Sequence, residues 1–309
     1  MTVPLLRAVG LTKRYPSVTA LDELTVEVPH GRVGLVGANG AGKTTLFRLI
    51  LGLARPTAGR VEVLGQRVEA DPIAVRERLG YMPEHDCLPG DQSAADVVAT
   101  FGELSGLPPR AARQRASEVL DLVGLDEARF RPTEGFSTGM KQRTKLAQAL
   151  VGDPELVLLD EPTAGLDPLG REEMLALVSR LGTFGISVLL ATHLLDDVQR
   201  VCDHVVMLDG GRLVVAGPTG ELLEQTGTVT VEVDQRAGEL AGAMVAHGLD
   251  ARELEGVVEV TVNGDTDLDA IRDLIADLDL PLHRLTVGLG SLDEVFLRRA
   301  LGAHGGDPV

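Results

Sequence analysis

Short apolar runs alternate with amphipathic segments along most of the chain. Four runs rich in aliphatic and β-branched residues occupy positions 33–37 (VGLVG), 156–160 (LVLLD), 187–192 (SVLLAT) and 204–210 (HVVMLDG). Segments such as KTTLFRLILGL and REEMLALVSRL instead repeat apolar residues with the period of a helix. Short, fully apolar strands separated by helices are typical of a parallel sheet covered on both faces. The pattern therefore predicts an α/β fold.

The strand pattern stops between Pro89 and Val151. The segments DQSAADVVATFGELSG, PRAARQRASEVLDLVG and TGMKQRTKLAQALVG in this part have the composition and periodicity of helices. We expect a helical subdomain at about residues 88–151, inserted into a sheet domain that covers residues 1–224.

The composition changes at residues 225–309, which hold 16 acidic and 6 basic residues and no lysine. Three strand patterns (TVTVEVD, VVEVTVNG, HRLTVGL) alternate there with three helix patterns (AGELAGAMVAHG, LDAIRDLIADL, LDEVFLRRAL). This order predicts a small α+β accessory domain, for which a ferredoxin-like arrangement is one candidate. Its acidic surplus is more typical of a solvated surface than of a binding site.

Composition narrows the functional classes. A net charge of −17 argues against a general nucleic-acid binder, because phosphate backbones would repel the protein. The two cysteines, Cys87 and Cys202, have no spacing typical of zinc sites or disulfide frameworks, which favours a reducing, cytoplasmic location. The sequence has no apolar run of signal-peptide or membrane-span length, so we expect any membrane association to depend on a partner.

The segment GANGAGKT matches the phosphate-loop pattern and lies between a strand and an apolar helix. Its glycines allow backbone N–H groups to surround a polyphosphate at the positive end of the helix. Lys43 is predicted to reach the β- and γ-phosphates and Thr44 to bind Mg²⁺. A glycine-rich turn without a ligand is the alternative interpretation. The predicted nucleotide-binding residues here are Gly37, Asn39, Gly40, Gly42, Lys43, Thr44 and Thr45.

The segment LVLLDEP ends a buried strand with two adjacent carboxylates, Asp160 and Glu161. Ligands bind at the carboxyl edge of the sheet in this fold class. Asp160 is predicted to hold Mg²⁺ through its hydration shell. Glu161, expected to point the opposite way along the pleat, would polarise the attacking water. Beside a phosphate loop, the pair indicates a nucleotide hydrolase.

With these motifs, nearly all of residues 1–225 resemble the nucleotide-binding subunits of ABC transporters, a branch of the P-loop NTPases. The family's signature motif, usually LSGGQ, corresponds here to FSTGM at 136–140. The resemblance implies that Ser137 and Gly139 contact ATP held by a second copy, or by a paralogous ATPase subunit, packed head to tail. It also explains why one chain carries two phosphate-binding turns.

The resemblance assigns roles to four further residues. Tyr15 corresponds to the aromatic residue that stacks on adenine, and Glu84 replaces the family's usual glutamine near Mg²⁺. Asp167 corresponds to the aspartate that communicates across the dimer. His193, which follows SVLLAT, corresponds to the switch histidine at the γ-phosphate. The signature departs from LSGGQ at Thr138 and Met140, but Ser137 and Gly139 are present, so we expect an active ATPase.

The resemblance therefore implies an ATP- and Mg²⁺-dependent ATPase that powers a membrane transporter. Its transmembrane helices would lie on separate permease subunits, and this chain would be peripheral on the cytoplasmic face of the membrane. The C-terminal SLDEVFLRRAL is similar to the extension of the ABC-2 exporter branch, which favours export. The alternatives are a soluble ABC-type ATPase acting on ribosome or DNA complexes, and a nucleotide sensor without turnover. No nucleic-acid partner is expected.

Overall fold

The computed structural model describes residues 3–224, 227–233, 236–254, 256–262, 264–288, 291–293 and 295. The chain divides into two compact units, Met1–Ala216 and Gly217–Val309. Each unit is described by itself. The boundary predicted after residue 224 lies at the end of the helix α8 (Thr219–Glu224), a few residues inside the second unit.

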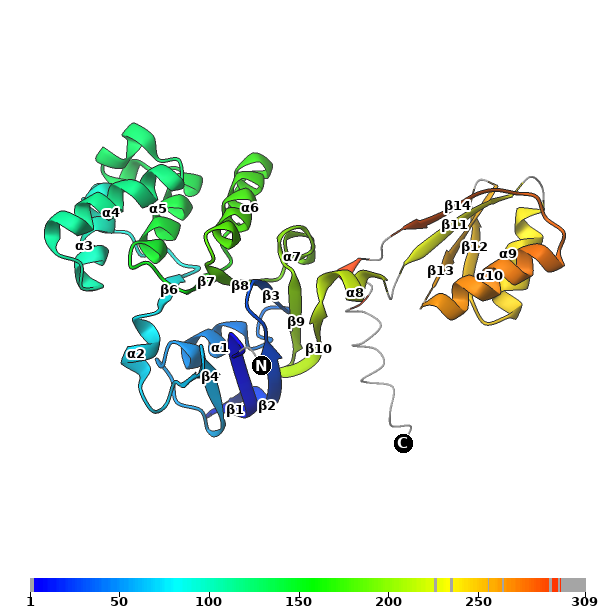
Figure 1. Cartoon of the computed structure of the whole chain (residues 1–309), viewed down its shortest axis with the longest axis horizontal. Coiled ribbons are helices and arrows are strands. Elements are labelled where there is room, and N and C mark those ends of the chain that lie inside the picture. Colours follow the sequence, from blue (N-terminus) through cyan, green and yellow to red (C-terminus); the bar gives the residue numbers. More distant parts are fainter. Residues whose placement is uncertain are drawn as a thin grey trace. The chain divides into compact units, whose positions relative to one another are not determined.

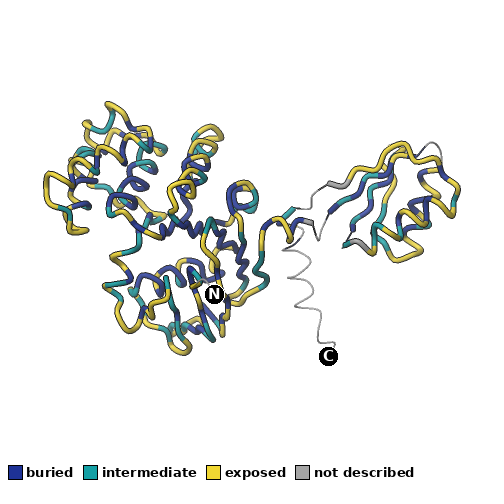
Figure 2. Tube along the Cα trace, viewed as in Figure 1, coloured by how far each residue is buried: buried dark blue, intermediate teal, exposed yellow. Residues whose placement is uncertain are grey.

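A six-stranded sheet forms the centre of the first unit, in the order β10-β9-β3-β8-β7-β6 (Figure 1). Neighbouring strands from β9 to β6 pair in parallel, which confirms the α/β prediction. Every residue of β7 and β8 is buried, as the continuous apolar runs require (Figure 2). The strands are β3 (Arg32–Val36), β6 (Leu79–Met82), β7 (Leu156–Asp160), β8 (Ser187–Thr192), β9 (His204–Asp209) and β10 (Arg212–Pro218).

The helices of the first unit outside the helical subdomain are α1 (Lys43–Ile50), α2 (Pro72–Arg76), α6 (Pro168–Thr183) and α7 (Leu195–Val201). The side chain of Val198 on α7 packs directly onto β3 at Gly34. At Gly34, a Cβ atom would lie 2.2 Å from Cγ1 of Val198, so this contact requires glycine.

A second sheet of the first unit is antiparallel and was not predicted from the sequence. Its order is β2-β1-β4-β5, with β1 at Leu6–Tyr15, β2 at Val18–Val28, β4 at Ala58–Val63 and β5 at Gln66–Arg67. Register shifts interrupt the β1–β2 ladder. Its apolar face joins α1 and the central sheet in one core, in which Phe47 and Leu46 are fully buried.

The helical subdomain consists of α3 (Ala94–Leu104), α4 (Pro109–Leu122) and α5 (Thr138–Leu150), which confirms the three predicted helices. Two 3₁₀ turns, η1 (Asp126–Phe130) and η2 (Thr133–Gly135), lead from α4 towards α5. The Ser93 and Ser137 hydroxyls cap α3 and α5 by accepting hydrogen bonds from backbone N–H groups of their first turns. Ser137 is therefore placed at the N-terminus of a 13-residue helix.

The second unit contains an antiparallel sheet in the order β12-β13-β11-β14. With α9 and α10 on one of its faces, the chain order β-α-β-β-α-β is ferredoxin-like (Figure 1). The exposed strand β12 was not predicted, and the helix predicted at 292–301 lies largely outside the described residues. The elements are β11 (Thr228–Val233), α9 (Ala237–Ala246), β12 (Asp250–Leu254), β13 (Val257–Thr261), α10 (Asp265–Asp277) and β14 (Leu282–Gly288).

Candidate nucleotide site

The loop between β3 and α1 is built around glycines that a side chain could not replace. Gly42, which immediately precedes α1, has φ of 105°, and a Cβ there would lie 2.6 Å from the carbonyl oxygen of Ala20. At Gly37 a Cβ would lie 2.4 Å from the carbonyl oxygen of Leu208. The loop backbone thus packs directly against neighbouring strands, which fixes its shape at the helix N-terminus.

Lys43, the first residue of α1, points back under this loop. Its Nζ donates hydrogen bonds to the carbonyl oxygens of Gly37 at 2.6 Å and Ala38 at 3.4 Å. The same Nζ lies 3.8 Å from Oε1 of Glu161, and both side chains are more than nine-tenths buried. The buried ammonium and carboxylate therefore partly neutralise each other at the base of the loop.

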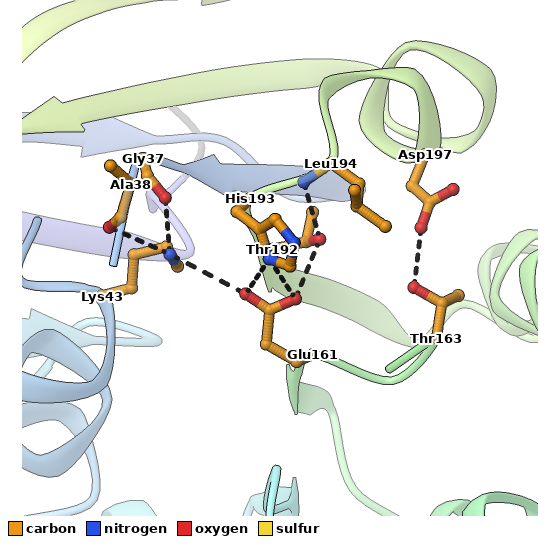
Figure 3. Close-up of polar contacts among 9 residues, drawn as sticks. All are labelled: Gly37, Ala38, Lys43, Glu161, Thr163, Thr192, His193, Leu194 and Asp197. Carbon is orange, nitrogen blue, oxygen red and sulfur yellow. Dashed lines mark hydrogen bonds and ion pairs between the residues drawn. The ribbon is translucent and has the colours of Figure 1, made fainter. Parts of the chain in front are cut away.

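Glu161 lies between Lys43 and His193, as Figure 3 shows. Nδ1 of His193 is 3.1 Å from both carboxylate oxygens, and the Thr192 hydroxyl donates a hydrogen bond to Oε2 at 3.2 Å. Three groups from α1 and the end of β8 thus fix the orientation of one carboxylate. A water molecule placed beside this carboxylate could lose a proton to it.

The backbone at Glu161 corrects one expectation. Pleat alternation predicted that Asp160 and Glu161 would point in opposite directions, but both line the same cavity. Glu161 has φ of 48°, so the regular strand geometry ends at Asp160 and the chain turns. A non-glycine residue with positive φ is strained, and such residues are common at functional sites.

Carboxylate charge accumulates on the side of this cavity lined by Asp160 and Glu84. Asp160 is only 2% exposed, and burial, followed by the negative charges of Glu84 and Glu161, raises its pKa to about 6. Lys43 acts in the opposite direction by lowering that pKa. Oxygen ligands, carboxylates in particular, are those that Mg²⁺ prefers.

A cavity of about 380 Å³ collects most of the residues predicted from the sequence. Gly37 does not line it but orients Lys43 through its carbonyl oxygen. Among the described residues, no three of His, Cys, Asp or Glu are grouped so as to hold a metal by themselves. The predicted residues that line the cavity are Tyr15, Asn39, Gly40, Gly42, Lys43, Thr44, Thr45, Glu84, Asp160, Glu161 and His193.

Ser137, Gly139 and Asp167 line a different cavity, of about 640 Å³. The Ser137 hydroxyl accepts a hydrogen bond from the Met140 N–H, and the Asp167 carboxylate accepts one from the Gly170 N–H at the start of α6. The fold therefore does not bring these three residues into the cavity that contains Lys43.

A relative of nearly the same length identifies the family. The daunorubicin resistance ATP-binding protein DrrA3 of Streptomyces coeruleorubidus is 37% identical over 306 residues, which cover 93% of each chain. This chain belongs to the ABC transporter family. The family model for ABC transporters matches residues 21–164, which include the phosphate loop, the FSTGM turn and both carboxylates.

Two further comparisons agree with this assignment. The Nod factor export ATP-binding protein I of Ralstonia nicotianae is 35% identical over 234 residues, covering 75% of this chain and 73% of the relative. The structure of cbiO1 from Clostridium perfringens, part of the ABC transporter complex cbiONQ, aligns with a TM-score of 0.65. It is 29% identical and covers 71% of this chain and 90% of that one. This ABC protein is thus an ATP-binding subunit that hydrolyses ATP to power a membrane transporter.

Sequence reasoning missed two polar contacts beside the site of this ABC subunit. The Thr192 hydroxyl contacts Glu161, and its place at the end of SVLLAT, next to His193, was the available signal. Thr163 Oγ1 donates to buried Asp197 at 2.7 Å, which ties the turn after Glu161 to α7 (Figure 3). This second pair gave no signal, because neither residue stands next to one that the motifs had singled out as catalytic and α7 brings them together only in the fold.

Proposed function

We propose that this subunit binds MgATP in the cavity around Lys43 and hydrolyses it with Glu161 as the base. The observation that carries this proposal is the convergence of Lys43, Thr192 and His193 on the Glu161 carboxylate at the edge of the phosphate loop. Lys43 and the loop N–H groups would bind the phosphates. His193 would orient Glu161 and contact the γ-phosphate, while Tyr15 at the cavity wall would stack on adenine.

Mg²⁺ would be held by Thr44, Asp160 and Glu84. These residues line the same cavity and supply only oxygen ligands, which suits a hard cation. Mg²⁺ usually completes its coordination with phosphate oxygens and water, so a cage made only of protein side chains is not needed. When bound, the ion would stabilise the negative charge that develops on the phosphates.

Binding of MgATP should weaken as the pH falls through about 6. Asp160 has a pKa raised to about 6, so below this pH it carries a proton that Mg²⁺ must displace. Affinity should fall by up to about tenfold for each pH unit below that value. Titration of a fluorescent ATP analogue in the presence of Mg²⁺ between pH 5 and 8 measures the slope. Asp160→Asn should reduce the slope of affinity against pH. Protonation of ATP itself contributes equally to both proteins, so an equal slope in the variant would contradict the prediction.

We further propose that two copies share each ATP. Ser137 and Gly139 lie at the N-terminus of α5, where N–H groups and the helix dipole favour an anion, but they line a cavity separate from that of Lys43. A second chain packed head to tail would bring its own Ser137 turn to this chain's phosphates. Asp167, at the start of α6 in the same cavity, would then lie at the contact between the two chains.

We propose that the transporter works as an exporter and that its membrane-spanning helices belong to separate permease subunits. No helix within the described residues is long and apolar enough to cross a membrane. Two of the relatives described above are a daunorubicin resistance ATP-binding protein and a Nod factor export ATP-binding protein. The subunit would then lie on the cytoplasmic face of the membrane, held there by its permease.

Purification of the tagged chain from detergent-solubilised membranes of its native host tests this assembly. We expect a polytopic membrane protein in near-stoichiometric amount, identified by mass spectrometry. Tagged Lys43→Ala is the matched control, because it should keep the permease while losing turnover. Recovery of ribosomal or DNA-repair proteins without a membrane partner would overturn the transporter assembly and leave the ATPase chemistry intact.

A further inference from the structure

Lys145 is a buried lysine in the middle of α5. It is only 3% exposed, and its Nζ donates hydrogen bonds to three successive backbone carbonyls. The oxygens belong to Pro83 at 2.7 Å, Glu84 at 2.9 Å and His85 at 3.4 Å. One side chain of the helical subdomain therefore holds the segment that follows β6.

Burial makes this arrangement costly unless the carbonyls stay in place. Desolvation lowers the pKa of the Lys145 ammonium, and the nearby Cys87, Asp86 and Glu84 raise it. A buried ammonium deprived of its hydrogen bonds is strongly destabilising. Displacement of the 83–85 segment from α5 would therefore leave the buried ammonium without hydrogen-bond acceptors, so the lysine opposes that displacement.

Two further contacts hold the same region against α5. At Gly80 in β6, a Cβ would lie 2.1 Å from the carbonyl oxygen of Ala149, so strand and helix backbones meet there directly. The more exposed Lys141, one helical turn before Lys145, forms an ion pair with Asp86 at 2.7 Å. The segment is thus bound to α5 on both sides of Glu84.

Glu84 is the residue of this segment that lines the cavity around Lys43, which we call the phosphate cavity, together with Thr44 and Asp160. Its backbone carbonyl is held by Lys145, while its side chain is exposed to the cavity. The N-terminus of the same α5 helix presents Ser137 to the other cavity. The helix α5 therefore connects the Ser137 cavity with the cavity around Lys43. By the proposed function, these two cavities contact two different nucleotides.

We propose that Lys145 is a positioning residue that fixes the Glu84 carboxylate in the phosphate cavity and links its position to that of the Ser137 turn. This inference rests on the proposed role of Glu84 towards Mg²⁺. Lys145 does not line the phosphate cavity, so it would touch neither ATP nor the metal. It acts through the backbone carbonyls of residues 83–85.

The natural cysteines allow a direct test of the hold on this segment. Cys87 is exposed and lies two residues beyond His85, whereas Cys202 is buried. A nitroxide label on Cys87 in a Cys202→Ala background reports local mobility by electron paramagnetic resonance. Lys145→Met should shift the spectrum from immobilised to mobile. Thr144→Val, a buried substitution on the same helix, should leave the spectrum unchanged, because the Thr144 hydroxyl donates its hydrogen bond to the Met140 carbonyl within α5.

A second measurement tests whether Lys145 acts through Glu84. The Mg²⁺ concentration for half-maximal ATP hydrolysis should rise about tenfold in Lys145→Met, as for other residues that orient metal ligands. Glu84→Ala should raise it as well, and adding Lys145→Met to Glu84→Ala should cause no further rise. Where Lys145→Met does not fold, Lys145→Gln replaces it in both measurements, because its shorter, uncharged side chain has only two N–H donors for the three carbonyls.

An unchanged label spectrum in the Lys145 variant would overturn the positioning role. A tenfold rise that persists in the Glu84→Ala background would show that Lys145 does not act through Glu84, and would overturn the proposal too. If the unmodified chain hydrolyses no ATP, the proposed function fails. The label spectrum still decides whether Lys145 holds the segment.

Discussion

Glu161→Gln is expected to abolish nearly all ATP hydrolysis while ATP binding is retained. Loss of a general base lowers the rate by about 10² to 10⁴-fold. The substitution keeps the size of the side chain, and the Thr192 hydroxyl can still donate to the amide oxygen. Removing the charge 3.8 Å from Lys43 should not weaken the attraction of that ammonium for phosphates. Phosphate release measures turnover, and equilibrium titration measures ATP affinity.

The same variant should accumulate as an ATP-bound dimer, because the shared site closes on ATP but is not released by hydrolysis. Light scattering with ATP and Mg²⁺ should therefore report twice the mass of the chain. Glu155→Gln is the control at the opposite end of β7, where Glu155 pairs with Arg78 on the surface. Turnover of Glu161→Gln at the rate of the unmodified chain would remove Glu161 from the catalytic role.

Lys43→Ala is expected to lose both ATP affinity and turnover. The ammonium now bonded to Gly37 and Ala38 is the buried cation at the base of the phosphate loop. A hydrogen bond to a charged group contributes about 1.5–3 kcal/mol, which corresponds to roughly a tenfold to hundredfold loss of affinity. The remaining carboxylates of Asp160 and Glu161 would also repel the phosphates.

Equilibrium titration of ATP and steady-state hydrolysis measure these two losses. Arg272→Ala is the control, because it removes a cation from exposed ion pairs with Asp269 and Asp273 on α10 and should change neither value beyond about twofold. The thermal midpoint of Lys43→Ala should be checked, since Glu161 loses its nearest cation. Hydrolysis that continues at its original rate would refute the phosphate-loop assignment.

Much of the α/β core was predictable because its signals are local. The runs that became β7 and β8 are apolar at nearly every position, which fits strands buried on both faces. The three helices of the subdomain have long amphipathic patterns, and those of α3 and α5 begin at a capping serine.

The antiparallel sheet and β12 were missed for different physical reasons. β1 contains register shifts against β2, so its buried positions do not alternate regularly with exposed ones. β12 is an edge strand in which four of five residues are exposed, and its sequence DAREL carries no apolar stripe. β1 is stabilised by pairing with β2 and β4, and β12 by pairing with β13. The residues of a strand do not by themselves reveal these partners.

Local sequence patterns were sufficient to indicate the chemistry of this protein. The spacing of GANGAGKT, the carboxylates after LVLLD and the histidine after SVLLAT are local patterns, and each specifies a backbone shape or a side chain at a strand end. Which of these groups contact one another depends on the folded chain. Positive φ at Glu161 directs both carboxylates to one cavity, and the parallel pairing of β7 with β8 brings His193 within 3.1 Å of Glu161. Lys145 reaches the 83–85 segment for the same reason. Contacts between residues far apart in sequence depend on chain folding, which no local pattern encodes.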